Sequence, residues 1–435
     1  MSIAVITLGQ ATEALVGGLE RLHGPVTVVR RCSELAELMA ACQSGLAQAA
    51  VVSEGSSELT ASLVDRLDIV GVSIVVLTDD PAEATRLESI GVVPAALDIG
   101  PIDLAGRITE VVDMQRERGR SKSSVEAGFA ELSFQSSPPV EAAVQHDTVN
   151  PGRIIAVWGP AGAPGRTLVA VNIAAELAAA GNSVILVDAD SYGASAAAML
   201  GLLEESAGLA QACRLADQGI LDGSAFDRAA THVHTSKGSF RILSGITRAD
   251  RWTELRASAL SVVLERAKQA ADVVVVDVGF CLEADEELSF DTLAPRRNGA
   301  TLRCLELADE VIAVGAADAV GVPRLVRGIA ELELACPHVS PRVVLNKVRQ
   351  AAAGRSPRRQ LDEAWERFGP RMGIEAYLPA DFPACDAALL CGTVLLESAP
   401  TSPLRLAIAG LVCAPVQQNR KSAGRTTRAM RLLKR

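Results

Sequence analysis

Aromatic residues, long apolar runs and metal-binding patterns are scarce in this 435-residue chain, and each shortage excludes a class of protein. Aromatic residues make up 3% of the chain, whereas proteins that bind single-stranded nucleic acid stack bases on aromatic side chains. No apolar run reaches the roughly 20 residues that a membrane-spanning helix needs. The first residues lack the basic segment of a secretory signal peptide, so we expect a cytoplasmic protein.

Cysteine is present but not in any pattern that binds metal. The nine cysteines form no C-x-x-C pair and no cluster with histidine. Cytosolic proteins keep such thiols reduced, and isolated cysteines are usually buried core residues. We therefore expect reduced thiols and no structural zinc.

The charge of the chain is uneven. The net charge is −10, yet residues 420–435 hold seven basic residues and no acidic one, so the remainder is more acidic than the whole. An acidic body makes specific DNA binding unexpected. We predict a basic tail over residues 416–435, which either makes weak peripheral contact with anionic lipid at the inner membrane or is a solubilising tail.

Residues 1–115 alternate between strand-like and helix-like segments. Strands are expected at residues 3–8, 26–29, 49–52, 74–77 and 92–97, with helical segments between them. This alternation predicts a flavodoxin-like parallel sheet with helices on both faces. Residues 116–152 then have a linker composition, rich in charge, serine and proline.

Residues 153–415 predict a second, larger α/β domain. Strands are expected at residues 154–157, 184–187, 239–243, 273–276, 311–314 and 343–345, each short, continuously apolar and rich in valine or isoleucine. Such runs are typical of parallel strands buried on both faces. The predicted fold is therefore a doubly wound parallel sheet.

The first strand of this domain leads into a loop rich in glycine, alanine and proline, residues 159–165, and then into a helix. Glycine loops at helix N-termini present backbone N–H groups and a positive dipole, which suits a phosphate. The strict pattern G-x-x-x-x-G-K-[ST] is not met, because Arg166 stands where the lysine belongs. A tight strand-to-helix turn without a ligand is the alternative.

Polar residues follow four of the predicted strands, at the edge where open α/β sheets bind ligands. Thr167 would give its hydroxyl to Mg²⁺, and Asp188 and Asp277 would hold the metal and its water shell. Asp190 is placed to orient an attacking water, and Asn346 is a candidate reader of the base. Each also has a plain structural interpretation, since strand-end Asp and Asn often cap helices or end strands.

These motifs resemble the MinD/ParA family of deviant-Walker P-loop ATPases, which carries K-G-G-x-G-K-[ST]-[ST], then D-x-D after the next strand, then an apolar run that ends in Asp. The late turn Pro379-Ala380-Asp381 resembles the family's turn near the base. The resemblance implies ATP or ADP with Mg²⁺ as cofactors. The predicted site comprises catalytic Asp190, metal-binding Thr167, Asp188 and Asp277, and nucleotide-binding Gly159, Gly162, Ala163, Pro164, Gly165, Arg166, Thr167, Leu168, Asn346, Pro379 and Asp381.

The departures from the family pattern imply weak or absent ATPase activity. The signature lysine that reaches across the dimer falls at Ala161, the P-loop lysine at Arg166, and the second hydroxyl residue at Leu168. Arginine is a planar fork, and exchanging it for lysine at a phosphate turn is not conservative. Arg296 and Arg297 are candidate replacement cations, with solvated surface arginines as the alternative.

The first domain resembles a response-regulator receiver domain that has lost its chemistry, because Ser53 stands where the phospho-accepting Asp is expected. A receiver-like domain followed by a MinD-like domain resembles the Flp-pilus localisation ATPases (CpaE/TadZ) and the MinD-like septum-site proteins of actinobacteria. That resemblance implies an ATP-binding homodimer that positions a septum or a pilus or secretion machine, with a partner docked on the N-terminal domain. The alternative is a non-enzymatic scaffold with a vestigial site.

Overall fold

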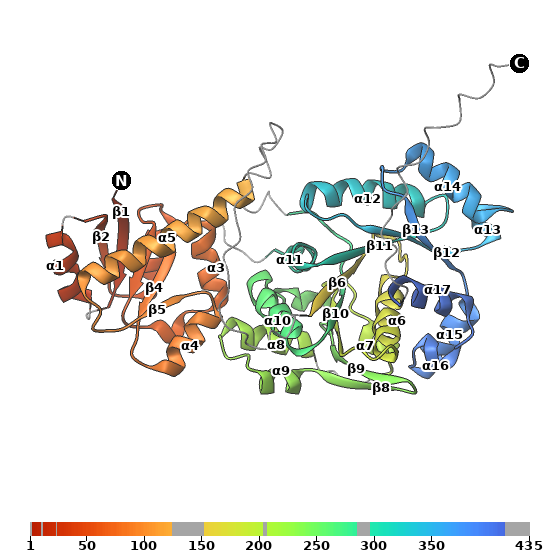
Figure 1. Ribbon diagram of the computed structural model, residues 1–435, viewed down its shortest axis with the longest axis horizontal. Coiled ribbons are helices and arrows are strands. Elements are labelled where there is room, and N and C mark those ends of the chain that lie inside the picture. Colours follow the sequence, from red (N-terminus) through yellow and green to blue (C-terminus); the bar gives the residue numbers. More distant parts are fainter. Residues whose placement is uncertain are drawn as a thin grey trace, which may run out of the picture.

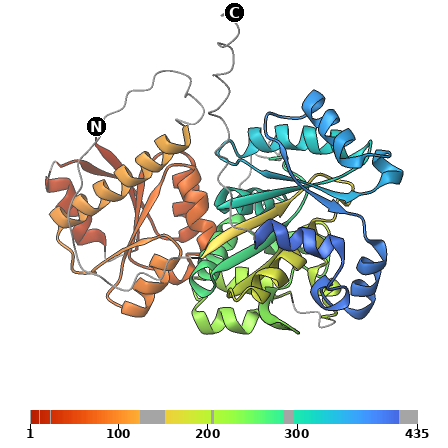
Figure 2. The same cartoon turned by 45° about the vertical axis from the view of Figure 1, so that its right-hand side comes forward.

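A computed structural model of the chain describes residues 2–9, 12–22, 24–123, 152–202, 207–284 and 296–413. An N-terminal α/β unit and a larger C-terminal α/β unit lie side by side and touch (Figures 1 and 2). Most of the predicted linker and the predicted basic tail lie outside the described residues. No helix in the described part of the chain is both long and apolar enough to cross a membrane.

The N-terminal unit is built on five parallel strands in the order β2-β1-β3-β4-β5. This is the flavodoxin-like order, so the predicted fold of this unit is confirmed. The strands are β1 (Ile3–Leu8), β2 (Val26–Cys32), β3 (Ala49–Val52), β4 (Ser73–Leu77) and β5 (Val93–Ala95). The helices are α1 (Thr12–Leu22), α2 (Leu35–Gln43), η1 (Ser56–Glu58), α3 (Ala61–Ile69), α4 (Pro81–Ser89) and α5 (Pro101–Ser123).

Each face of this sheet has its own core. Leu38, Leu67 and Leu87 from α2, α3 and α4 are buried on one face, while Leu19 and Ile108 from α1 and α5 are buried on the other. Because β3 and β4 are covered on both sides, they read as continuous apolar runs rather than as alternating ones. Helix α5 continues to Ser123, beyond residue 115, where we predicted the domain to end.

The larger unit has eight strands in the order β13-β12-β11-β6-β10-β7-β9-β8. Seven of them are parallel, so the predicted doubly wound sheet is confirmed, and the edge strand β8, which we did not predict, pairs antiparallel with β9. The strands are β6 (Arg153–Trp158), β7 (Val184–Ala189), β8 (Thr231–Thr235), β9 (Gly238–Leu243), β10 (Val273–Val278), β11 (Glu310–Ala316), β12 (Arg342–Val348) and β13 (Ile374–Pro379).

Helices cover both faces of the larger sheet. One face packs against α8, α9, α10, α11, α12 and α14, and the other against α6, α15, α16 and α17. The helices are α6 (Arg166–Ala179), α7 (Ala196–Met199), α8 (Gly208–Asp217), α9 (Gly223–Ala229), η2 (Ala249–Glu254), α10 (Ala257–Ala270), α11 (Gly299–Leu307), α12 (Gly321–Ala335), α13 (Gln350–Ala353), α14 (Pro357–Phe368), α15 (Phe382–Cys391), α16 (Leu395–Ser398) and α17 (Pro403–Val412).

A buried ion pair fastens α17 to α6. Arg405 donates from Nε and Nη2 to the two carboxylate oxygens of Glu176, at 2.6 and 2.7 Å. The Glu176 side chain is 4% exposed and the Arg405 side chain 17%. Helix α6 carries the glycine loop at its N-terminus, so this pair helps to fix the helix on which the loop rests.

We predict that Glu176→Ala lowers the free energy of unfolding by about 3–5 kcal/mol, because it leaves the Arg405 guanidinium buried without its counter-charge. Denaturant unfolding followed by circular dichroism measures the change. Glu363→Ala is the matched control, since Glu363 pairs with Arg359 on an exposed face of α14. We expect a change of about 0.5 kcal/mol or less there. Equal effects of the two substitutions would contradict the structural role of the buried pair.

Candidate functional site

The predicted site residues gather at the carboxyl ends of three central strands. β10 lies between β6 and β7 in the sheet, and Asp277 near the end of β10 is the register partner of Asp188 on β7 and of Val157 on β6. The loop that follows β6 and the acids that end β7 and β10 therefore share one edge of the sheet. This is the edge at which parallel α/β sheets bind ligands.

The glycine loop follows β6 directly and ends at the first residue of α6. Gly162 and Gly165 have φ angles of 112° and 97°, in the left-handed region that glycine reaches without strain. Ala163 has φ of 51°, which costs a residue with a Cβ some conformational energy. Pro164 has no N–H, so the loop presents one donor fewer to an anion than a glycine-only loop would.

The Arg166 side chain turns inward, toward the acids. Its Nη1 donates to the Gly159 carbonyl at 2.8 Å and its Nη2 donates to Oδ2 of Asp190 at 3.0 Å. Both side chains of the ion pair are buried, 12% and 5% exposed. The guanidinium also lies 6.0 Å from the centre of the Phe280 ring. The positive charge that the sequence assigned to phosphate oxygens is thus paired with Asp190 in this structure.

Backbone N–H groups donate hydrogen bonds to both carboxylates of the D-x-D segment. Oδ2 of Asp188 accepts from the N–H of Ala196 at 2.9 Å, at the start of α7, and Oδ1 of Asp190 accepts from the N–H of Tyr192 at 2.9 Å. Burial raises the pKa of Asp188 to about 6, and the charge of Asp190 adds to the rise while the Ala196 N–H opposes it. Both acids lie at the carboxyl end of β7, and both accept hydrogen bonds from the backbone of the segment that follows.

Asp277 differs from its two neighbours because its charge is unsatisfied. The residue is completely buried, and neither of its carboxylate oxygens accepts a hydrogen bond from any described residue. Burial raises its pKa well above the usual range, and the Asp188 charge raises it further, while the nearby Thr167 hydroxyl and Arg166 charge oppose the rise. A buried, orphaned carboxylate beside a hydroxyl and a second carboxylate fits Mg²⁺, which prefers oxygen ligands. Among the described residues, the chain could offer Thr167, Asp188 and Asp277 to such an ion.

The end of β12 holds the glycine loop from the other side. Asn346 is 2% exposed, and its Nδ2 donates to the Pro164 carbonyl at 2.8 Å. The next residue, Lys347, donates from Nζ to the Ala163 carbonyl at 2.6 Å. Lys347 and Ala163 are also the two non-glycine residues with positive φ in the described part of the chain. Asn346, which we predicted to contact the base, therefore binds the glycine loop in this structure. Lys347, which our sequence reasoning missed, binds the same loop.

The remaining predicted residues flank this centre. Asp381 caps α15 through the N–H of Ala384 and accepts from Oγ of Ser402 at 2.6 Å, next to Pro379 at the end of β13. Leu168, in the first turn of α6, is partly buried and packs against the core. Pro379 and Asp381 thus form a capped turn beside the site.

Two arginines lie beside the loop region. Arg297 stacks on the Tyr192 ring, 3.9 Å from its centre, and donates to the Ser191 carbonyl at 3.3 Å, so it belongs to the D-x-D loop. Arg324 of α12 lies so close to Gly162 that a Cβ there would stand 2.5 Å from its Nη1. Arg324 also lines a cavity of about 100 Å³ beside the loop. The sequence offered Arg297 as a candidate cation but gave no sign of Arg324.

Together these features define a doubly wound α/β domain. A strand, a glycine loop and a helix N-terminus face buried acids at the ends of neighbouring strands, which is the architecture of phosphate-binding α/β domains. A family model described as ParA, NUBPL iron-transfer P-loop NTPase, matches residues 150–216, which contain the loop and the D-x-D segment. A search of curated protein sequences finds no match.

Solved structures of similar arrangement include a ParA family ATPase from Chlorobium tepidum, with 20% identity and a TM-score of 0.48, over 60% of this chain and 98% of the other. The cell division ATPase MinD from Pyrococcus furiosus has 20% identity and a TM-score of 0.46, over 60% and 97%. The septum site-determining protein MinD from Pyrococcus horikoshii, solved as a Mg-ADP complex, has 18% identity and a TM-score of 0.46, over 60% and 94%.

We predict that Asp277→Asn raises the free energy of unfolding by about 1–3 kcal/mol at pH 7.5, because it removes an unsatisfied buried charge. The gain should shrink as the pH falls, since wild-type Asp277 then becomes neutral. Between the ordinary aspartate range and about pH 6, folded protein also retains a proton on Asp188 that the unfolded chain releases, so wild-type stability falls as the pH rises through this window.

Denaturant unfolding of both proteins at pH 7.5 and pH 5 measures the difference. Asp227→Asn is the control, because Asp227 is exposed and pairs with Arg241 at the surface. If Asp277→Asn gave no larger a gain in the free energy of unfolding at pH 7.5 than at pH 5, the carboxylate would not carry the unfavourable charge that its burial implies.

Proposed function

We propose that this chain is a MinD/ParA-like nucleotide-binding spatial regulator with ATP or ADP and Mg²⁺ as its ligands. The observation that carries the proposal is the orphaned, fully buried Asp277 beside Asp188 and opposite the glycine loop, since a divalent cation bridging phosphate to these acids would satisfy it. The family match over residues 150–216 supports the same ligand class. The Pyrococcus horikoshii relative is a Mg-ADP complex, the class of ligand that we propose here.

We propose that hydrolysis at this site is slow or absent. Arg166 is bound to Asp190 and to the Gly159 carbonyl, so neither its charge nor the Asp190 carboxylate is available for a phosphoryl group or a water without rearrangement. Pro164 removes one N–H donor from the loop, and Ala161 carries no charge. Preorganised positive charge is the main source of catalysis in phosphoryl transfer, and this site has little of it aimed outward.

The biological role that we propose is positioning of a septum or of a pilus or secretion machine. In this role the chain would form a cytoplasmic homodimer and bind a protein partner through its receiver-like N-terminal domain. Its basic tail would make weak peripheral contact with the membrane. The receiver-like domain is not switched by aspartyl phosphorylation, because Ser53 ends its third strand and gives its hydroxyl to the Leu8 carbonyl at 3.1 Å.

A non-enzymatic scaffold with a vestigial site is the second candidate. The buried Arg166–Asp190 ion pair favours it, because a nucleotide must displace one charge from the other before the site can accept a phosphate. The two candidates differ in a single property, which is whether nucleotide and Mg²⁺ bind at all.

We predict that millimolar Mg-ATP or Mg-ADP raises the melting temperature of the purified protein by several degrees, as expected of ligand present well above its Kd. Thr167→Ala should lose most of the shift that depends on Mg²⁺, whereas Thr253→Ala, an exposed threonine in the same domain, should keep it. Differential scanning fluorimetry with and without EDTA measures both effects.

If neither nucleotide changed the melting temperature, the result would favour the non-enzymatic scaffold over the nucleotide-binding regulator. Phosphate release measured on the same samples tests the second part of the proposal. Robust Mg-dependent hydrolysis that Arg166→Ala abolishes would show that the arginine turns outward in catalysis and that the site is not degenerate.

A further inference from the structure

The N-terminal unit is anchored on the larger unit by one carboxylate. Asp217, the last residue of α8, accepts from both the N–H and the hydroxyl of Ser62 through Oδ1, at 2.8 and 2.5 Å. Ser62 lies in the first turn of α3. A carboxylate placed at a helix N-terminus interacts favourably with the helix dipole, so this contact combines charge with direct hydrogen bonding.

A second contact lies next to the first, where α4 meets the turn after α8. Arg86 donates from Nη1 to the Gln218 carbonyl, and Ser89 donates from Oγ to the Gly219 carbonyl, both at 3.2 Å. Gly219 has φ of 73°, and a Cβ there would come within 2.9 Å of Arg86 and Ile90. The turn at the end of α8 is therefore tightly fitted to the N-terminal unit.

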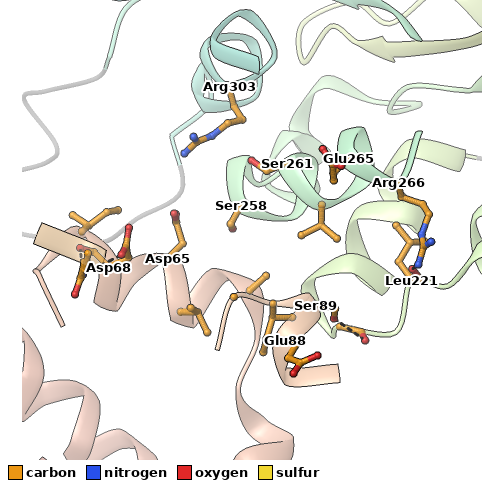
Figure 3. A pocket seen from close by; sticks show the side chains of 18 of the residues that line it. Asp65, Asp68, Glu88, Ser89, Leu221, Ser258, Ser261, Glu265, Arg266 and Arg303 are labelled. Carbon is orange, nitrogen blue, oxygen red and sulfur yellow. Dashed lines mark hydrogen bonds between the residues drawn. The ribbon is translucent and has the colours of Figure 1, made fainter. Parts of the chain in front are cut away.

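Beyond these contacts the two units separate around a cleft of about 1420 Å³. Figure 3 shows Asp65 and Asp68 from α3 on one wall of this cleft and Arg303 from α11 on the other. The N-terminal unit is thus fastened to the end of α8 and faces open space beside α11. The Ser62 hydroxyl also lies 3.4 Å from the Ser258 hydroxyl of α10, so a shift of this unit about the α8 contact would break this hydrogen bond too.

The other end of α8 reaches the candidate nucleotide site. The first N–H groups of the helix, of Gly208 and Leu209, donate to Oγ and the carbonyl of Ser244, at 3.0 and 2.9 Å. The next residue, Gly245, is packed on Asp188, since a Cβ there would lie 2.8 Å from the Asp188 carbonyl oxygen and 3.0 Å from its carboxyl carbon. A single helix, buried along one face, thus joins the domain contact to a predicted metal ligand.

A second connection runs through α11. Asn298, just before this helix, accepts from the Tyr192 hydroxyl at 2.8 Å, and Arg297 donates to the Ser191 carbonyl. Both partners follow Asp190 directly in the chain. Arg303, further along α11, lines the interdomain cleft. Both acids of the D-x-D segment are therefore connected through packed helices to the face that meets the N-terminal unit.

In this docked arrangement the acids are paired within the protein. Asp188 caps α7 through Ala196, and Asp190 holds Arg166. A bound Mg-nucleotide needs Asp188 oriented to the metal shell and Arg166 freed for phosphate, which moves the segments that Gly245 and Tyr192 pack against. A helix packed at native density passes such a displacement on rather than absorbing it.

Building on the proposed function, we propose that docking of the N-terminal domain on the end of α8 holds the nucleotide site in its self-paired form, so that docking and nucleotide binding oppose each other. The coupling is reciprocal: loosening the contact tightens nucleotide binding, and nucleotide loosens the contact by the same factor. The docked N-terminal domain then inhibits nucleotide binding. A partner that binds α3 and α4 would relieve this inhibition by displacing the domain from α8.

Asp217→Lys tests this coupling, because it places a positive charge against the N-terminus of α3. We expect its Kd for a fluorescent ATP analogue with Mg²⁺ to fall at least fivefold relative to full-length wild type, which is the lower end of ordinary allosteric coupling. Glu333→Lys makes the same change of charge at an exposed position on α12, and we expect its Kd to stay within about twofold of wild type. Ser62→Ala, a milder change at the same contact, should move in the direction of Asp217→Lys.

Hydrogen exchange measures the reciprocal effect in wild type, where saturating Mg-nucleotide should speed exchange of the first turn of α3. Circular dichroism confirms that each variant is folded, and Ser62→Ala keeps the comparison if Asp217→Lys is not. Unchanged or weaker nucleotide binding in the contact variants, with α3 exchange unaffected, would overturn the coupling while leaving the proposed function intact. Absence of nucleotide binding in wild type and in every variant would instead overturn the proposed function and the coupling with it.

Discussion

Two carboxylates lie side by side in the interior of this protein because of the register between β7 and β10. That register pairs Asp188 with Asp277 at the end of two fully buried strands, where water cannot screen either charge. Ionising both acids is costly without a compensating cation, because burial and their mutual repulsion raise both pKa values. The nearby Arg166 charge and the N–H of Ala196 at the start of α7 oppose this rise at Asp277 and Asp188 respectively.

The arginine at position 166 places a positive charge beside these acids and pairs it with the third acid, Asp190. A guanidinium is a planar fork, so it binds the Gly159 carbonyl with one nitrogen and Asp190 with the other, whereas a lysine ammonium would act as a single point charge. The arginine therefore joins the beginning of the loop to the D-x-D segment. The same two bonds direct its positive charge toward Asp190 and the Gly159 carbonyl.

The continuous runs of valine and isoleucine made the parallel strands predictable, because strands covered on both faces need apolar side chains at every position. We did not predict β8, because Thr231–Thr235 is an edge strand in which Val233 alone is buried. Its sequence is therefore mostly polar and lacks an apolar run. The acids were predictable because each directly follows an apolar run. The contacts that hold the glycine loop were not predictable, since the hydrogen bond between Lys347 and Ala163 joins residues far apart in the chain, and a positive φ at a lysine cannot be inferred from composition.

The anchoring of the N-terminal unit was equally invisible in the sequence, and it changes what that unit can do. In this unit the hydroxyl of Ser53, directly after β3, donates to the backbone of β1. The surface of α3 and α4 is instead committed to Asp217 and the turn that follows it. A domain with a charged, hydrogen-bonded contact to the end of α8 can be docked there or released. Because α8 begins against Ser244 and the neighbouring Gly245 packs on Asp188, the proposed coupling would act on a candidate metal ligand.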